Sequence, residues 1–324
     1  MYRNIMVPLD GSSFSRNAML AGLRIASRCG ATLRLVKVAV APAIPGTPEG
    51  LATAGELAKD KHAIELAALY AAAAECRAHA NIPVIASLER GPVAEALISY
   101  AHRSDVDLIV MRSHGRGGIK RVWFGSVADR LIRESGMPVL VVRPPSVATA
   151  LEGGTQLNRI LLPLDGSELA ERAIVPAVKV ASVDGASITL LRVVTAWKDQ
   201  TPGVLESGLG PASAVEVSEA QRYLDSILAW PDTGELRVTR RVVIASDPAD
   251  AILEVAREIE ADVVTLATRG LGALRRAASG SVSDRVMRES EVSTIVLHPE
   301  QSSGPLQQPT QLLWSSPSFS AKAT

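Results

Sequence analysis

The chain has 324 residues, of which 47% are hydrophobic and 21% are charged, and its 34 Lys and Arg residues balance 34 Asp and Glu residues. This neutral balance argues against nucleic-acid binding, which needs a basic surface, and the apolar runs are too short or too often interrupted by charge to span a membrane. The N-terminus lacks the pattern of an export signal, and Cys29 and Cys76 form neither a C-x-x-C pair nor a zinc motif, so we expect a cytoplasmic protein.

The first half of the chain alternates β-branched runs with helical patterns. The spacing predicts strands at 5–9, 32–40, 82–89, 106–113 and 138–143, with helices at 12–30, about 51–80, 92–103 and 126–135 between them. Continuous Val, Ile and Leu runs separated by helices are typical of a parallel sheet that is covered on both faces. The sequence therefore predicts a doubly wound α/β domain of five parallel strands.

The second half repeats this pattern. PLDGS at 8–12 recurs at 163–167, GSVADRLIRES at 125–135 returns as GSVSDRVMRES at 280–290, and both pairs are 155 residues apart. A constant offset between separated segments indicates duplication of a whole domain. We place the two domains at 1–146 and 158–300, with a linker at 147–157 and a Ser-, Pro- and Gln-rich tail, 301–324, that we expect to be disordered.

The repeated motifs follow the first and fourth strands of each domain. Ligands of open α/β sheets bind beyond the carboxyl ends of the strands, where the winding direction reverses. The second motif is a glycine-rich loop that enters a helix at Gly125–Ser126, where unpaired amide groups favour an anion. Several cations lie in these loops: Arg112, His114, Arg116, Lys120 and Arg121, then Arg269, Arg275 and Arg276. This pattern predicts a phosphate-bearing ligand.

The same motifs also have a structural interpretation. Ser126 and Asp129 have the S-x-x-D spacing of a helix cap, and DGS at 10–12 is also typical of a turn without any ligand. Both alternatives apply equally to the second half. The chain contains no Walker phosphate loop, no H-E-x-x-H and no G-x-S-x-G, and its five histidines lack metal-ligand spacing. We therefore predict neither a catalytic nor a metal site.

NIMVPLDGS and RILLPLDGS at the domain starts, with a glycine loop close to G-x2-G-x9-G-[ST], resemble the universal stress protein family in its tandem form. The resemblance implies two domains with strand order 3-2-1-4-5 that pair through their last strands as an internal pseudo-dimer. It also implies ATP, with or without Mg²⁺, held by an acidic residue after strand one, a valine in strand two and the glycine loop. By position these residues are Asp10, Val38, Gly115, Gly125, Ser126, Asp165, Val193, Gly270, Gly280 and Ser281.

The first glycine of the pattern is replaced by Arg112 in the first half and by Ala267 in the second. An alanine adds only a methyl group, whereas an arginine either blocks the crevice or neutralises phosphate, so the second site is expected to be the more permissive.

From the resemblance, the leading hypothesis is a stress-response protein that binds ATP or a related adenine nucleotide. It forms homo-oligomers or binds a protein partner through last-strand or edge surfaces. Occupancy of the nucleotide sites then regulates this assembly or the partner. A nucleotide-free interaction module and a slow ATPase are the alternatives, and no positioned general base favours hydrolysis.

Overall fold

The computed structural model describes residues 1–12, 15–39, 48–112, 125–143, 157–195, 211–229, 236–268 and 282–298, with backbone only at 48–59 and 211–213. The elements of the first half are β1 (Asn4–Pro8), α1 (Ser15–Cys29), β2 (Thr32–Ala39), α2 (Pro48–His79), β3 (Val84–Arg90), α3 (Val93–Arg103), β4 (Leu108–Arg112), α4 (Ser126–Glu134) and β5 (Val139–Val142). The second half contains β6 (Arg159–Pro163), α6 (Glu168–Glu171), α7 (Ile174–Asp184), β7 (Ser187–Thr195), α8 (Pro211–Leu228), β8 (Val238–Ala245), α9 (Pro248–Glu258), β9 (Val263–Ala267), α10 (Val282–Glu289) and β10 (Ser293–Leu297).

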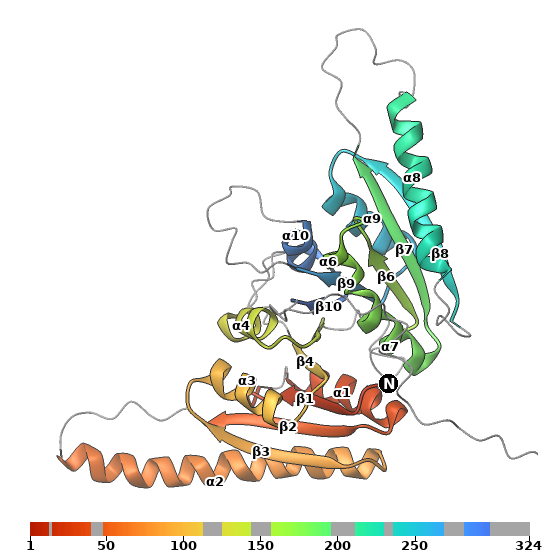
Figure 1. Cartoon of the computed structure of the whole chain (residues 1–324). Coiled ribbons are helices and arrows are strands. Elements are labelled where there is room, and N and C mark those ends of the chain that lie inside the picture. The colour runs from red at the N-terminus through yellow and green to blue at the C-terminus, as the bar shows by residue number, and fades with distance from the viewer. Residues whose placement is uncertain are drawn as a thin grey trace, which may run out of the picture.

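All ten strands form one continuous sheet in the order β3-β2-β1-β4-β5-β10-β9-β6-β7-β8. Within each half the strand pairs are parallel, and the halves join through an antiparallel pair in which Leu140 lies opposite Ile295. Figure 1 shows the two halves on either side of this seam, each with its own helices. The prediction of two tandem doubly wound α/β domains is confirmed.

The central strands are buried on both faces, as the apolar runs predict, whereas the outer strands β3 and β8 are partly exposed. In β5 every residue is buried, and alternate side chains enter opposite layers: Leu140 packs in one apolar cluster, and Val139 and Val141 pack in the other. Each cluster contains residues from both halves of the chain. The two domains therefore share a continuous core, in addition to the backbone hydrogen bonds at the seam.

Polar contacts reinforce this junction. The buried Arg143 guanidinium donates to the Met287 carbonyl oxygen at 2.6 Å, and Asp184 lies 3.1 Å from Arg24 and 3.4 Å from Arg28 on the other domain. Because β5 and β10 pair with each other, neither is an open edge for another chain. The expected route to partners through last-strand surfaces is thus already used inside the chain, and the outer strands of the sheet are β3 and β8.

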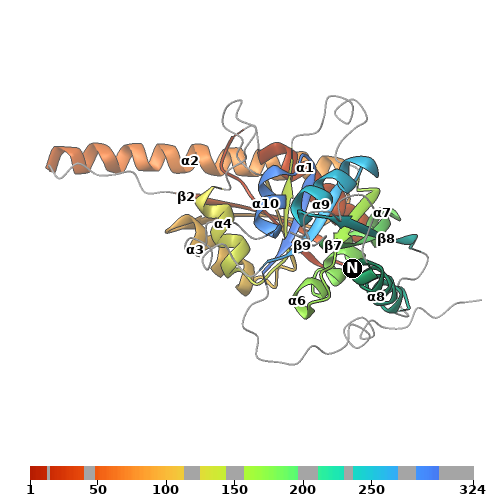
Figure 2. The same ribbon diagram turned by 90° about the horizontal axis from the view of Figure 1, so that it is seen from above.

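The halves differ most in their helices. The single helix α1 of the first half corresponds to two elements, α6 and α7, in the second. The helix α2 has 32 residues and extends past the edge of the sheet in both views of the molecule (Figures 1 and 2). Among the residues that the structure describes, no helix combines the length and apolar composition that crossing a membrane requires.

Candidate functional site

A cavity of about 660 Å³ lies beyond the carboxyl ends of β1, β2 and β4 in the first half. It forms there because β1 and β4 are neighbours while the chain winds in opposite directions on either side of them. Four of the residues predicted for this half line the cavity, namely Asp10, Val38, Gly125 and Ser126. The fifth, Gly115, lies outside the described residues.

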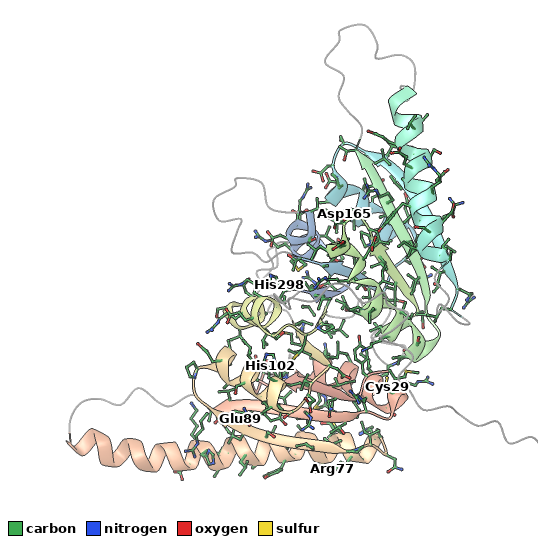
Figure 3. The ribbon with its side chains drawn as sticks, in the orientation of Figure 1. Cys29, Arg77, Glu89, His102, Asp165 and His298 are labelled. Carbon is green, nitrogen blue, oxygen red and sulfur yellow. The ribbon has the colours of Figure 1, made fainter. Side chains whose placement is uncertain are left out.

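The second half has a cavity of about 720 Å³ at the equivalent place. Asp165 and Val193 line it, as predicted, together with Arg192, Ala267 and Thr268. Figure 3 labels Asp165 at this end of the second half, where it is the second residue after β6. The predicted residues Gly270, Gly280 and Ser281 lie outside the part of the chain that the structure describes.

The two aspartates make the same turn. In the first half Asp10 Oδ1 accepts hydrogen bonds from the Ser12 amide at 2.9 Å and from its hydroxyl at 2.6 Å. Asp165 Oδ1 accepts the same pair from Ser167, at 2.9 and 2.5 Å. The intervening glycine has a left-handed φ, +82° at Gly166. Turn initiation, the structural interpretation of DGS, is therefore correct for both motifs, and it fixes each carboxylate at the rim of its cavity.

The environment of Asp165 favours its charged form. Burial opposes ionisation, but the hydroxyl and amide of Ser167 donate to the carboxylate, and Arg192 adds a nearby positive charge. Together these hydrogen bonds and this charge hold the pKa of Asp165 below its usual value. The carboxylate is thus an acceptor at neutral pH.

Helix α4 begins without a side-chain cap. Its N-cap is Gly125, which makes no side-chain hydrogen bond to the helix, and Asp129 pairs instead with Arg133, 2.8 Å away. By contrast, the N-cap Asp247 of α9 accepts from two amides of its own helix. The cap interpretation of S-x-x-D is therefore wrong for Ser126 and Asp129. The amides at the start of α4 belong to residues that line the cavity.

The backbone conformation and packing of Gly125 do not require a glycine. Its φ is −61°, which any residue adopts, and no atom of the described residues lies within 4 Å of a Cβ atom built on it. A side chain here would occupy the cavity at the positive end of the α4 dipole. The glycine therefore keeps open the space in which an anion could approach the backbone closely.

Each cavity also contains a cation that the sequence reasoning missed. Lys37 in β2 lines the first cavity, with its Nζ atom 3.8 Å from Glu65 Oε1, and only 14% of either side chain is exposed. Its equivalent, Arg192 in β7, donates to the Leu164 carbonyl oxygen at 3.3 Å and lies 5.9 Å from the centre of the Tyr223 ring. The signal was available, because a basic residue precedes the predicted adenine-contacting valine in both halves.

At the end of strand four the halves differ. Arg112 lines the first cavity and Ala267 the second, yet the two volumes, about 660 and 720 Å³, are similar. The arginine therefore does not fill its cavity. It adds positive charge beside Lys37 and Lys61, which also line that cavity.

A smaller cavity of about 420 Å³ adjoins the second site. Arg192, Val193 and Thr195 border both spaces, and Glu216, Glu219 and Tyr223 from α8 form the other wall of the smaller one. The second half therefore presents an acidic and aromatic wall next to its cavity.

Residues 1–143 and 156–298 each match the family described as the universal stress protein family. A universal stress protein of Mycolicibacterium smegmatis is 29% identical over 301 residues, which cover 91% of this chain and 97% of that relative. For a universal stress protein of Mycobacterium tuberculosis, 29% identical, the match of 197 residues spans 62% of the relative. The fold is similar to the crystal structure of a universal stress protein from Archaeoglobus fulgidus, with a TM-score of 0.62, 19% identity, and coverage of 91% of this chain and 98% of that one.

Proposed function

Because the chain belongs to the universal stress protein family, with one family domain in each half, we propose that it binds ATP or a related adenine nucleotide and acts as a regulatory protein in the stress response. Membership in the family supports the stress-response role. Nucleotide binding rests on the two cavities, and a cytoplasmic location stays a prediction from the sequence.

The observation that carries the proposal is the start of α4. Within the described ranges no side chain caps α4, so its first amides and its positive dipole end, which line the cavity, suit a phosphate group. Lys37, Lys61 and Arg112 add positive charge within the same cavity and exceed its two carboxylates, Asp10 and Glu65, the second of which pairs with Lys37. This arrangement favours a ligand that carries several negative charges over a neutral one.

The other predicted residues suit the rest of a nucleotide. Val38 and Val193 provide apolar surface for a base at the ends of β2 and β7, and Asp10 and Asp165 provide carboxylate acceptors at the rims. The roles of Gly115, Gly270, Gly280 and Ser281 stay predictions from the sequence. We propose that both sites bind, since Arg112 leaves the first cavity open.

Any Mg²⁺ would accompany the nucleotide phosphates. Among the described residues, no group of three or more His, Cys, Asp or Glu side chains is placed to hold a metal ion. Magnesium usually binds through one or two protein carboxylates and the substrate phosphates. The metal dependence of binding is therefore expected to follow the phosphate count of the nucleotide.

A nucleotide-free interaction module is the second candidate. The turns that Asp10 and Asp165 form with their serines explain both aspartates without any ligand. Slow hydrolysis of ATP is less well supported, because the family resemblance assigns both aspartates to the adenosine side of the nucleotide and leaves no general base for the phosphates. A regulatory role through binding alone agrees best with these contacts.

Equilibrium dialysis of the full chain against labelled ATP tests the proposal. We expect two nucleotides per chain, together with a melting temperature that rises with ATP concentration by mass action. AMP and inorganic phosphate should compete more weakly than ATP at the first site, because they present fewer charges to its three cations. An absence of both ATP uptake and any thermal shift would leave only the interaction-module candidate.

A further inference from the structure

Helix α2 is apolar on its exposed face as well as on its buried face. Leu69, Ala73 and Cys76 are buried against the sheet. On the outer side Ile64 is 69% exposed and Tyr70 is 53% exposed. Six alanines around them are exposed as well: Ala63, Ala67, Ala68, Ala71, Ala74 and Ala78. The charged or polar exposed residues lie toward the ends of this segment, Asp60 and Lys61 at one end and Arg77 and His79 at the other. A surface helix normally places polar side chains on its solvent side.

From Ser218 onward the corresponding helix of the second half follows that normal rule, although Ala214 and Val215 before it are exposed. Buried Ala220, Leu224 and Ile227 of α8 face the sheet. Its exposed positions from 218 onward are polar: Ser218, Glu219, Gln221, Arg222, Asp225 and Ser226. The two helices hold equivalent places in duplicated domains, so the apolar exterior of α2 is not a requirement of the fold.

Six of the exposed residues of α2 form one continuous stripe. Positions 60, 64, 67, 71, 74 and 78 follow alternating steps of four and three, which keep side chains on a single helix face, about 27 Å long. At 100° per residue this face lies opposite the buried one. Figures 1 and 2 show α2 at the periphery of the molecule with its sheet on one side only.

We propose that this stripe is a self-association surface, on which the α2 helices of two copies of the chain pack antiparallel about a two-fold axis near Leu69. The spacing of the six positions is symmetric about position 69. An antiparallel partner therefore places position 67 opposite 71, 64 opposite 74 and 60 opposite 78.

The side chains agree with this register. Ile64, the largest side chain of the stripe, faces the small Ala74 of the partner helix, so that large and small residues interdigitate and the backbones approach closely. Asp60 at one end of the stripe approaches the end that carries His79 and Arg77, whose guanidinium also donates to the Val84 carbonyl oxygen, and this approach of opposite charges occurs twice by symmetry. Antiparallel helices also align their dipoles favourably. A second copy of the chain thus provides both the apolar surface and the complementary charges.

The size of the stripe sets the expected strength. A single pair of helices over this length buries less surface than a standard permanent interface of about 1,600 Å². The association is therefore weak and depends on protein concentration. It is also separate from the seam between β5 and β10, which lies inside one chain.

Sedimentation of the full chain, from low micromolar to near-millimolar concentration, measures this association directly. We expect a reversible monomer–dimer equilibrium, and Ala71→Glu should raise the dimer dissociation constant about tenfold or more, because it buries two carboxylates near the axis. Glutamate is a good helix former, so the melting temperature should not change. Ser218→Glu on the exposed face of α8 is the matched control and should leave the equilibrium unaltered.

Cross-linking tests the register. In a Cys29→Ser background, a mixture of Ala67→Cys and Ala71→Cys chains should form a mixed disulfide dimer under mild oxidation, faster than either variant alone. Faster dimerisation of each variant with itself would indicate parallel helices and overturn the proposal. A chain that stays monomeric at every concentration, or a dimer that Ala71→Glu does not weaken, would overturn it as well.

Discussion

The two cavities share a backbone framework but differ in the charges around it. Both halves hold an aspartate in the same turn and a basic residue at the same place in strand two. In the first half the basic residue, Lys37, pairs with Glu65, whereas Arg192 lies near the Tyr223 ring. The features that persist after duplication are those that shape the loops, and the features that diverge set the local charge. We therefore expect two sites of one kind with unequal ligand preference.

The largest expected effect comes from closing one cavity while leaving the other intact. Gly125→Val would place a branched side chain in the space at the start of α4, where an added Cβ meets no atom of the described residues. ATP affinity of the first site should fall about a hundredfold, roughly 2.7 kcal/mol. Isothermal titration should then show one tight nucleotide per chain in place of two.

The fold provides the control for this variant. The backbone at Gly125 is in an ordinary conformation, but valine is a poorer N-cap than glycine, so the melting temperature without ligand should fall slightly while the fold is kept. Two tight nucleotides per chain in Gly125→Val would show that α4 does not contact the ligand, and that the shared framework serves folding alone.

A smaller effect on ATP affinity is expected from Arg112, which lies at the end of β4 where the second half has Ala267. Arg112→Ala removes a guanidinium that lines the first cavity, and a charge-assisted hydrogen bond contributes about 1.5–3 kcal/mol. ATP affinity of the first site should fall at least tenfold, with a weaker dependence on salt.

The exchange in the other direction sharpens the comparison. Ala267→Arg should raise the affinity and the salt dependence of the second site, whose cavity has room for the added side chain. If Arg112→Ala instead strengthened ATP binding, the arginine would be an obstruction, and the second half would be the better site, as the sequence suggests.

Much of the fold could be predicted from the sequence because the repeat is so regular. A constant offset between PLDGS and the later glycine motif fixed the two domains, and the order of strands and helices placed both motifs at the same sheet edge. The structure brings Asp10, Val38, Gly125 and Ser126 to one cavity, as that reasoning expected.

Other features depended on packing that no pattern shows. Lys37 lies in β2 between buried apolar residues. The alternation of polar and apolar residues predicts which face of the strand Lys37 is on, but it does not show that this face borders a cavity. Ser126 and Asp129 have the spacing of a cap, yet the N-cap is Gly125, one residue earlier. The alanines of α2 fit a buried or an exposed position equally well, so the pattern could not distinguish its two faces.

The starts of α9 and α3, which flank the two cavities, are expected to differ by about 1 kcal/mol in the stability that their N-cap residues contribute. Asp247 caps α9 by accepting from the Ala249 and Asp250 amides, whereas the equivalent Pro92 of α3 makes no side-chain cap. Asp247→Ala should lower the free energy of unfolding by about 1 kcal/mol. Urea denaturation measures the loss.

Two further variants isolate the cap. Asp247→Asn keeps the acceptor for the helix amides while it removes the charge that pairs with Arg285, so it should cost less than the alanine variant. Pro92→Ala should leave the stability almost unchanged. Equal losses for Asp247→Ala and Asp247→Asn would assign the effect to the ion pair instead.

The smallest effect concerns the pH dependence of the second half. The folded chain holds the pKa of Asp165 below its usual value, so this carboxylate contributes stability above its unfolded pKa and loses it as the pH falls through the folded pKa. Ser167→Ala removes the hydroxyl donor and should raise the pKa of Asp165 toward its usual value, measured by NMR titration of the side chain.

The stability difference between Ser167→Ala and the wild type has two contributions, one that depends on pH and one that does not, so measurements at several pH values distinguish them. The Ser167 hydroxyl also accepts from the Ala170 amide at the start of α6, and that contribution does not titrate. The difference in unfolding free energy should therefore be greatest near neutral pH and shrink in acid to the constant contribution of the cap. The titrating part should be small because Asp165 is exposed and solvent screens its charge. A difference that grew as the pH fell would mean that the hydroxyl does not stabilise the charged form of Asp165.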